Sequence, residues 1–381
     1  MYAAKWSLKR PGLILLAAVA WLLAACGASS SGAVNWPGLS ADNSYVYVAS
    51  GPEVYAIDVA AQKEVWKFPA ERGRAVFLAP PAIVGSRVVV GNYGVPRGMF
   101  SPSVVVTLYG LEILAENGQA TPAEVWTQEN VATDRIIAAP LATADQVFVG
   151  TADNHLLALN ARDGSLQWEF ETGHSLWGQP TLAEGILYAA SMDRSIYAFR
   201  PNNGELIWQR TLDGAIAAKP IVVDGIVYVS CFDEKLHALD AQTGDALWTA
   251  DAQNWIWSAP AVDERQVYFA DADGQVYAVN RVTGAAAWQQ TVTGPVQASP
   301  LVADGVVVIA SQGDGIQGQL TALSADSGAT LWQVKTSSPI FATPVIVGDT
   351  LVVAVQSPEA LLIFYNLADG VQRWVYMPTT E

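Results

Sequence analysis

The chain has 381 residues, of which 51% are hydrophobic and 15% are charged. This length exceeds that of an ordinary compact domain but suits a ring of repeats, and the hydrophobic content can fill a large core. The formal net charge of −16 argues against nucleic acid as a partner, because phosphate binding requires a basic patch.

The first 25 residues predict a lipoprotein signal peptide. Three basic residues open this segment, and residues 13–23 form an apolar run that is too short to span a bilayer comfortably. The run ends in LAAC at residues 23–26, which resembles a bacterial lipobox. That resemblance implies that Cys26 is acylated and becomes the first residue of the mature chain. An ordinary signal peptide followed by a chance cysteine is the alternative.

Residues 26–33 are rich in glycine and serine and predict a lipidated flexible tether. An acyl-anchored protein of this type is attached to a membrane without spanning it, on the periplasmic face or at the cell surface. The other cysteine, Cys231, lies in a strand-like run. We expect it to be a small buried hydrophobe, with a reactive thiol as the alternative.

Eight tryptophans recur along the rest of the chain at steps of 60, 42, 40, 40, 40, 44 and 42 residues. A nearly constant period of about 40 residues indicates a repeat architecture. Prolines recur with the same period, and a glycine lies four residues before six of the tryptophans. The tryptophans, which we expect to be structural docking residues, are Trp66, Trp126, Trp168, Trp208, Trp248, Trp288, Trp332 and Trp374.

The repeat at residues 259–289 shows the unit most clearly. Residues 266–270 alternate as a strand does, and turn residues at 271–274 and 283–284 flank a third strand. Four short strands repeated eight times predict an all-β fold, an eight-bladed β-propeller of four-stranded antiparallel blades over residues 34–381. A parallel solenoid is the competing architecture, but hairpin turns imply antiparallel strands.

The segment ALDAQTGDALW at residues 238–248 resembles the tryptophan-docking motif of the pyrroloquinoline quinone (PQQ)-type propellers, and residues 158–168, 198–208 and 278–288 carry related segments. The likeness covers about residues 34–377. It implies the propeller type but not the chemistry, since one fold hosts many functions.

One branch of this superfamily comprises the quinoprotein alcohol dehydrogenases. Similarity to it implies PQQ and calcium near the axis, a catalytic aspartate and a ring of two adjacent cysteines, but this chain has no adjacent cysteine pair. The weak candidates for a channel site are Lys219, Trp177 and Trp257, and the tryptophans equally suit packing of the inner ring or its rim. We therefore expect no cofactor and keep PQQ with calcium as the alternative.

The other branch comprises outer-membrane assembly lipoproteins typified by BamB, which have a similar size, a lipobox, eight blades and no known enzyme activity. The resemblance implies docking on a partner subunit through two neighbouring loops, one with a Leu/Arg motif and one acidic. The matching connections, residues 172–180 and 212–220, carry neither motif clearly, so the identity of the partner stays open. The last blade is expected to keep its own outer strand, residues 372–376, with residues 33–39 as the inner strand of the first blade.

Catalytic and metal sites are not indicated. The histidines His155, His174 and His237 form no HxxxH, HExxH or Cys/His spacing that would predict zinc, and the serines lack a GxSxG elbow. Asp271 and Asp273 lie in a turn without the ligand series of a calcium loop. We therefore expect no catalytic residue and no metal.

The second repeat is about 20 residues longer than the others, and the excess is expected in loops at residues 92–103 and 117–122. Arg97, Met99 and Phe100 are the partner-contact candidates, because such side chains suit interface cores. A loop folded back on its own blade is the alternative.

These features predict a non-enzymatic, lipid-anchored, extracytoplasmic scaffold that presents a propeller rim to protein partners in envelope-protein assembly. We expect a monomeric domain that contacts the membrane through its lipid anchor only. The alternatives are a quinoprotein-like enzyme, or another ligand-binding propeller that uses the axial channel, and a cell-surface binder of carbohydrate or polymer.

Overall fold

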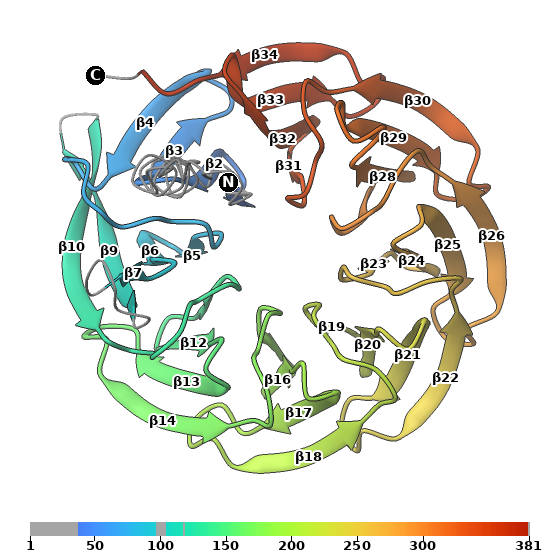
Figure 1. Cartoon of the computed structure of the whole chain (residues 1–381), viewed down its shortest axis with the longest axis horizontal. Coiled ribbons are helices and arrows are strands. Elements are labelled where there is room, and N and C mark those ends of the chain that lie inside the picture. Colours follow the sequence, from blue (N-terminus) through green and yellow to red (C-terminus); the bar gives the residue numbers. More distant parts are fainter. Residues whose placement is uncertain (1–36, 97–103, 117–118, 380–381) are drawn as a thin grey trace, which may run out of the picture. The chain divides into compact units, whose positions relative to one another are not determined.

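The computed structural model describes residues 37–96, 104–116 and 119–379. Within these ranges the chain contains no helix, and its strands form eight four-stranded antiparallel sheets and one two-stranded sheet. The eight sheets follow one another as the blades of a ring (Figure 1). The predicted eight-bladed β-propeller is confirmed. Nothing helical in these ranges is long and apolar enough to cross a membrane.

The first four blades, each taken from its inner to its outer strand, comprise β1 (Gly38–Ala41), β2 (Tyr45–Ser50), β3 (Glu53–Asp58) and β4 (Lys63–Phe68); β5 (Ala82–Val84), β6 (Arg87–Gly91), β9 (Thr107–Glu116) and β10 (Gln119–Glu129); β11 (Leu141–Ala142), β12 (Gln146–Gly150), β13 (His155–Asn160) and β14 (Leu166–Glu171); and β15 (Thr181–Ala183), β16 (Ile186–Ala190), β17 (Ser195–Phe199) and β18 (Leu206–Thr211).

The last four blades comprise β19 (Ile221–Val223), β20 (Ile226–Ser230), β21 (Lys235–Asp240) and β22 (Ala246–Asp251); β23 (Ala261–Val262), β24 (Gln266–Ala270), β25 (Gln275–Asn280) and β26 (Ala286–Thr291); β27 (Leu301–Ala303), β28 (Val306–Ser311), β29 (Gln319–Ser324) and β30 (Thr330–Lys335); and β31 (Val345–Val347), β32 (Thr350–Ser357), β33 (Ala360–Asn366) and β34 (Gln372–Tyr376). The remaining strands, β7 (Val95–Pro96) and β8 (Val104–Val105), pair with each other.

The two middle strands of a blade are apolar on both faces because neighbouring blades cover both. In the fourth blade every residue of β16 and β17 is buried, whereas the outer strand β18 has one buried residue, Trp208. Continuous apolar runs are typical of strands that are covered on both sides. The core of the propeller is therefore a series of seams between blades.

The repeated tryptophans lie in the outer strands and contact the next blade across these seams. The Trp208 indole Nε1 donates to the Ala241 carbonyl at 3.0 Å, and a Cβ on Gly244 would meet the Trp208 ring at 2.6 Å. Gly244 also has a φ of +74°, so both conformation and contact require glycine there. Equivalent hydrogen bonds join Trp126 to Ala161, Trp168 to Pro201, Trp288 to Ala325 and Trp332 to Leu367.

The ring closes by side-chain packing and not by exchange of a strand. β34 is the outer strand of the last blade and β1 is the inner strand of the first, as the sequence predicted, although β1 begins at Gly38 and residues 33–36 lie outside the described residues. Ile57 of the first blade shares a core cluster with Phe364 and Tyr376 of the last. The Tyr376 hydroxyl also donates to Glu64.

The excess length of the second repeat is only partly loop. The outer hairpin of this blade is long, since β9 has 10 residues and β10 has 11. The predicted loop at residues 117–122 is therefore wrong for residues 119–122. Pro122 fits within β10 because this edge strand pairs only with β9. In the other predicted loop β7 pairs with β8, and residues 97–103 lie outside the described residues.

A buried carboxylate joins the first blade to the connection that leaves it. The Glu53 side chain is 1% exposed and pairs with Arg72 at 2.8 Å and Lys67 at 3.4 Å. It also accepts the Tyr55 hydroxyl at 2.7 Å. Burial acts to raise the pKa of Glu53, but the hydrogen bonds from Tyr55 and Arg72 outweigh burial and hold the pKa below its ordinary value.

Replacing Glu53 by glutamine is expected to lower the free energy of unfolding at neutral pH by about 2 kcal/mol, the scale of hydrogen bonds to a charged group. Because the folded pKa is lowered, the stabilisation is complete above the unfolded pKa of about 4.3 and is lost as the pH falls through the folded pKa. Thermal unfolding of both proteins from about pH 7 to about pH 3 tests this. The difference in Tm should hold down to the unfolded pKa and narrow below it. A difference that does not change with pH would show that ionisation of Glu53 contributes nothing.

Candidate functional site

One face of the propeller carries the connections between blades. In an antiparallel blade, the turn from the second to the third strand and the connection from the fourth strand emerge at the same end. Hydrogen bonds join the two kinds of segment: the Gly173 N–H donates to Asp193 at 2.7 Å, and the Gln253 N–H donates to Asp271 at 3.2 Å. We call this surface the connection face.

Three successive connections, those that leave the third, fourth and fifth blades, each carry one buried aliphatic residue that anchors the connection to the blade before it. Leu176, Ile216 and Ile256 are all 0% exposed. The backbone N–H of each donates to a carbonyl in the preceding blade, with distances of 3.1 Å, 3.3 Å and 3.4 Å. The flanking residues are therefore held at fixed places on the rim, while their side chains can differ from repeat to repeat.

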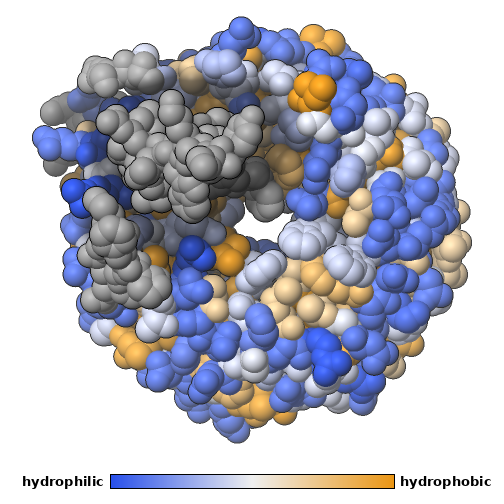
Figure 2. Space-filling view, viewed as in Figure 1, coloured by the Kyte–Doolittle hydropathy of each residue, from blue (hydrophilic) through white to orange (hydrophobic). Residues whose placement is uncertain are grey.

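The residues that follow these anchors line a pocket of about 540 Å³. Its lining comes from four successive connections and from turns of the second and third blades, so the pocket faces the axis of the ring, where Figure 2 shows a central opening. The volume is in the range of sites for small ligands. The lining residues are Tyr93, Asp134, Arg135, Ile137, Ala152, Ser175, Trp177, Ala217 and Trp257.

Four aromatic side chains form a cluster at this pocket. The ring centroids of Trp177 and Trp257 are 6.2 Å apart. These two tryptophans lie on different connections, and the connection that runs between them adds only the small side chain of Ala217 to the pocket lining. Phe232 stacks on Trp257 at 5.1 Å and on Trp255 at 5.5 Å. Trp255 is 51% exposed. We call Trp177, Phe232, Trp255 and Trp257 the aromatic cluster.

An arginine and a tyrosine also line the pocket. The Arg135 guanidinium carbon lies 5.2 Å from the centroid of the Tyr93 ring, within the range of a cation–π contact. Arg135 also pairs with Asp134 at 3.8 Å. The pocket thus combines aromatic rings with an arginine–aspartate ion pair.

The chain matches the family model described as outer membrane protein assembly factor BamB over residues 104–177, 171–255 and 233–381. These segments cover more than half of the sequence. The chain belongs to this family. The resemblance to PQQ-like and BamB-like propellers that the sequence suggested is therefore confirmed. No curated protein sequence matches the chain.

Solved structures similar to this BamB-family chain include BamB from Moraxella catarrhalis, with 18% identity and a TM-score of 0.69 over 83% of this chain and 92% of that one. The computationally designed Ika8 protein has 15% identity and a TM-score of 0.68 over 88% and 98%. The quinohemoprotein alcohol dehydrogenase from Comamonas testosteroni has 15% identity and a TM-score of 0.65 over 90% and 75%. At these identities the likeness shows the fold alone.

Lys219, one of the three channel candidates, does not line the pocket in this BamB-family propeller. Its Nζ donates to Gln179 Oε1 at 3.0 Å, and Gln179 Nε2 donates to the Pro140 carbonyl at 2.7 Å. This chain of hydrogen bonds links three blades around the channel. Burial lowers the pKa of Lys219. Of the three candidates, the structure brings Trp177 and Trp257 together.

The donor set of the pocket does not match what calcium requires. Calcium takes about six to eight oxygen ligands, whereas the pocket lining supplies one carboxylate, Asp134, and no amide side chain. Asp134 is also paired with Arg135. Within the described residues, this pocket therefore does not fit a calcium-bound quinone.

Four residues that the sequence singled out, Cys26, Arg97, Met99 and Phe100, lie outside the described residues. Conversely, Tyr93, Arg135 and Phe232 line or border the pocket without having been predicted. Comparison of repeats could have found Phe232, because equivalent turns carry the residues Ala152, Met192 and Ala272.

Proposed function

We propose that this protein is a non-enzymatic, lipid-anchored scaffold of the cell envelope that docks a protein partner on its connection face during assembly of envelope proteins. The family description, which names an outer membrane protein assembly factor, supports the role in assembly. The observation that carries the docking surface is the aromatic cluster beside Arg135 at the mouth of the channel.

The aromatic cluster has the composition of an interface core. Tryptophan, tyrosine and arginine are enriched among the interface residues whose truncation weakens binding most. Burial of Ile256 holds Trp255 and Trp257 in place, so a partner would immobilise little additional chain on binding. The net charge of −16 favours a partner segment that is not acidic.

A serine–histidine contact at the pocket gives little support to catalysis. Ser175 Oγ lies 3.1 Å from His174 Nδ1, but the same ring nitrogen accepts the Ser175 N–H at 2.8 Å. Among the described residues, no carboxylate hydrogen-bonds the other nitrogen of His174. The group that would orient the base in a triad is therefore missing.

Chemical crosslinking in native membranes, followed by capture of the tagged full chain, tests the scaffold role. The expected product is a crosslinked membrane-protein assembly subunit, with crosslinks that map to the connection face. Recovery of the lipoprotein alone, or crosslinks confined to the opposite face, would overturn the proposal.

Cys26→Ser is expected to release the protein from membranes. Acyl chains provide the only proposed anchor, so roughly nine tenths of the variant should move to the soluble fraction. Membrane fractionation and incorporation of labelled fatty acid measure the effect, and Cys231→Ser serves as the matched control that should stay bound. Continued lipid labelling of the Cys26 variant would refute the anchor.

A small ligand in the pocket is the second candidate, favoured by the pocket volume and by the two indoles, whose faces suit a planar ring. Titration of the full chain with PQQ and Ca²⁺, and with oligosaccharides, separates the two candidates. The scaffold proposal expects no saturable binding and no dye-linked oxidation of alcohols. Saturable binding that disappears in Trp177→Ala would favour the ligand site instead.

A further inference from the structure

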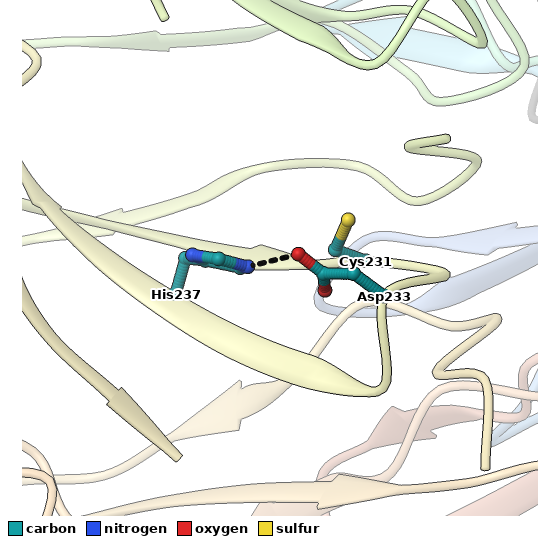
Figure 3. Close-up of side chains that lie close together, drawn as sticks. All are labelled: Cys231, Asp233 and His237. Atoms are coloured by element: carbon teal, nitrogen blue, oxygen red, sulfur yellow. Dashed lines mark hydrogen bonds and ion pairs between the residues drawn. The ribbon is translucent and has the colours of Figure 1, made fainter. Parts of the chain in front are cut away.

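One hairpin of the fifth blade gathers a thiol, a carboxylate and an imidazole. Cys231 and Asp233 lie in the turn between β20 and β21, and His237 lies in β21. Their potential ligand atoms all lie within 4.8 Å of one another, and His237 Nε2 is 2.9 Å from Asp233 Oδ2. Figure 3 shows the imidazole edge facing the carboxylate, with the thiol beside the carboxylate.

These three side chains are buried on the connection face. Cys231 is 0% exposed, and the side chains of Asp233 and His237 are 7% and 10% exposed. The thiol donates to the Gly214 carbonyl at 3.2 Å. The group is therefore enclosed by the turn and by the connection that enters this blade.

In the equivalent turns of the neighbouring blades, a tyrosine hydroxyl donates a hydrogen bond to an aspartate of the turn. In the fourth blade, Asp193 Oδ2 accepts the Tyr197 hydroxyl at 2.6 Å and Asp193 Oδ1 accepts the Ser195 N–H at 2.8 Å. In the sixth blade the accepting carboxylate stands two residues earlier, at the position of Cys231: Asp271 accepts the Tyr277 hydroxyl at 2.8 Å. The fifth blade keeps the aspartate but has cysteine where the fourth has Ser191, and histidine in place of tyrosine.

One buried atom of this turn in the fifth blade has no hydrogen-bond partner. Asp233 Oδ1 is enclosed by the protein and has no hydrogen bond, whereas the same oxygen of Asp193 in the fourth blade is satisfied. An unpaired buried carboxylate oxygen is destabilising. A cation beside Cys231 and His237 would supply the missing partner.

We propose that Cys231, Asp233 and His237 bind a divalent transition-metal ion of the zinc type. Sulfur, imidazole nitrogen and carboxylate oxygen are the ligands that zinc takes in proteins, and three protein ligands leave a fourth position for water or an external group. Calcium and magnesium, which prefer oxygen alone, do not match this set. On binding, the thiol S–H bond breaks, its proton passes to solvent, and a sulfur–metal bond forms. The proton that His237 Nε2 shares with Asp233 Oδ2 also passes to solvent as the nitrogen–metal bond forms, and the neutral imidazole keeps or takes up one proton on Nδ1.

The site would also fix the position of part of the aromatic cluster. Phe232 stands between two of the ligands in sequence and stacks on both Trp255 and Trp257. A metal that clamps the turn would hold Phe232 in place. The metal site itself does not depend on the proposed docking function.

The test uses the full chain purified in detergent, stripped of metal with a chelator and titrated with Co²⁺ as a spectroscopic substitute for Zn²⁺. The expected result is one ion per chain with a thiolate-to-cobalt charge-transfer band, which Zn²⁺ abolishes. Cys231→Ser and His237→Tyr convert the turn to the pattern of the fourth blade. Each should fold, and each should weaken Co²⁺ binding at least about tenfold, equivalent to 1.4 kcal/mol.

Two controls make the result decisive. His155→Gln alters the Asp153–His155 pair, whose atoms are 3.6 Å apart, and should leave the band unchanged, as should Cys26→Ser. No charge-transfer band in the wild-type chain would overturn the proposal whatever the variants do. A band that survives Cys231→Ser, or one that is lost in Cys26→Ser, would place the metal elsewhere and overturn it equally.

Discussion

Gly244→Ala is expected to destabilise the propeller by about 3 kcal/mol. Gly244 has a φ of +74°, and the left-handed region costs an L-residue about 1–2 kcal/mol. The new Cβ would also lie 2.6 Å from the Trp208 ring, and overpacking of a tight contact typically costs about 1–3 kcal/mol. Trp208 is itself held by its hydrogen bond to the Ala241 carbonyl, so the ring cannot move away from the new Cβ without breaking that hydrogen bond.

Gly225→Ala separates these two costs. Gly225 has a φ of +75°, but a Cβ built there would meet no atom within 4 Å. It should therefore show only the conformational cost, about 1 kcal/mol. Thermal and denaturant unfolding of both variants measure the difference. If both variants lost the same free energy of unfolding, the contact between Trp208 and Gly244 would contribute nothing to the stability of the seam between the blades.

The fold could be predicted from the sequence because its determinants are local and periodic. Trp208 and Gly244 belong to neighbouring repeats, and a contact of this kind recurs at six of the eight seams between blades. The error at residues 117–122 has a physical cause. Glycine and proline usually indicate a loop, but an edge strand has a free side on which Pro122 removes no ladder hydrogen bond.

The pocket could be predicted only in part because it depends on what differs between repeats. Trp177 and Trp257 were candidates because both lie near a repeat proline. Their contact requires the small Ala217 on the connection between them, which periodicity does not reveal. Tyr93 stands in the second blade where Phe232 stands in the fifth, because both backbone N–H groups donate to the preceding connection, but the added length of the second repeat hides this correspondence in the sequence.

The Cys231, Asp233 and His237 group illustrates the same limit. We expected Cys231 to be a small buried hydrophobe and His237 to bind no metal, and neither expectation takes the other residue into account. The hairpin brings them together around Asp233. A search for metal spacing missed the group, but comparison with Ser191 and Tyr197 of the preceding repeat would have shown that two hydroxyl positions had changed together.

Trp255→Ala is expected to weaken partner binding by about 2 kcal/mol, or roughly 30-fold in Kd. Trp255 is half exposed and stacks on Phe232, so a partner can bury the open half of the ring against a rigid base. Because much of the indole is already in solvent, its removal should change the free energy of unfolding by less than about 1 kcal/mol. Quantitative crosslinking in membranes, with the partner yield compared between wild type and variant, measures the effect.

Val282→Ala is the matched control, because it removes an exposed apolar side chain from the opposite face of the propeller. Val282 is 63% exposed and lies in the turn from β25 to β26, at the end of the blade opposite the connection face. Loss of apolar surface there should leave the crosslinked yield unchanged. If both variants lowered the yield equally, general surface hydrophobicity would explain the binding. If neither did, the aromatic cluster would be excluded as the docking surface, and the region around residues 97–103 would become the next to examine.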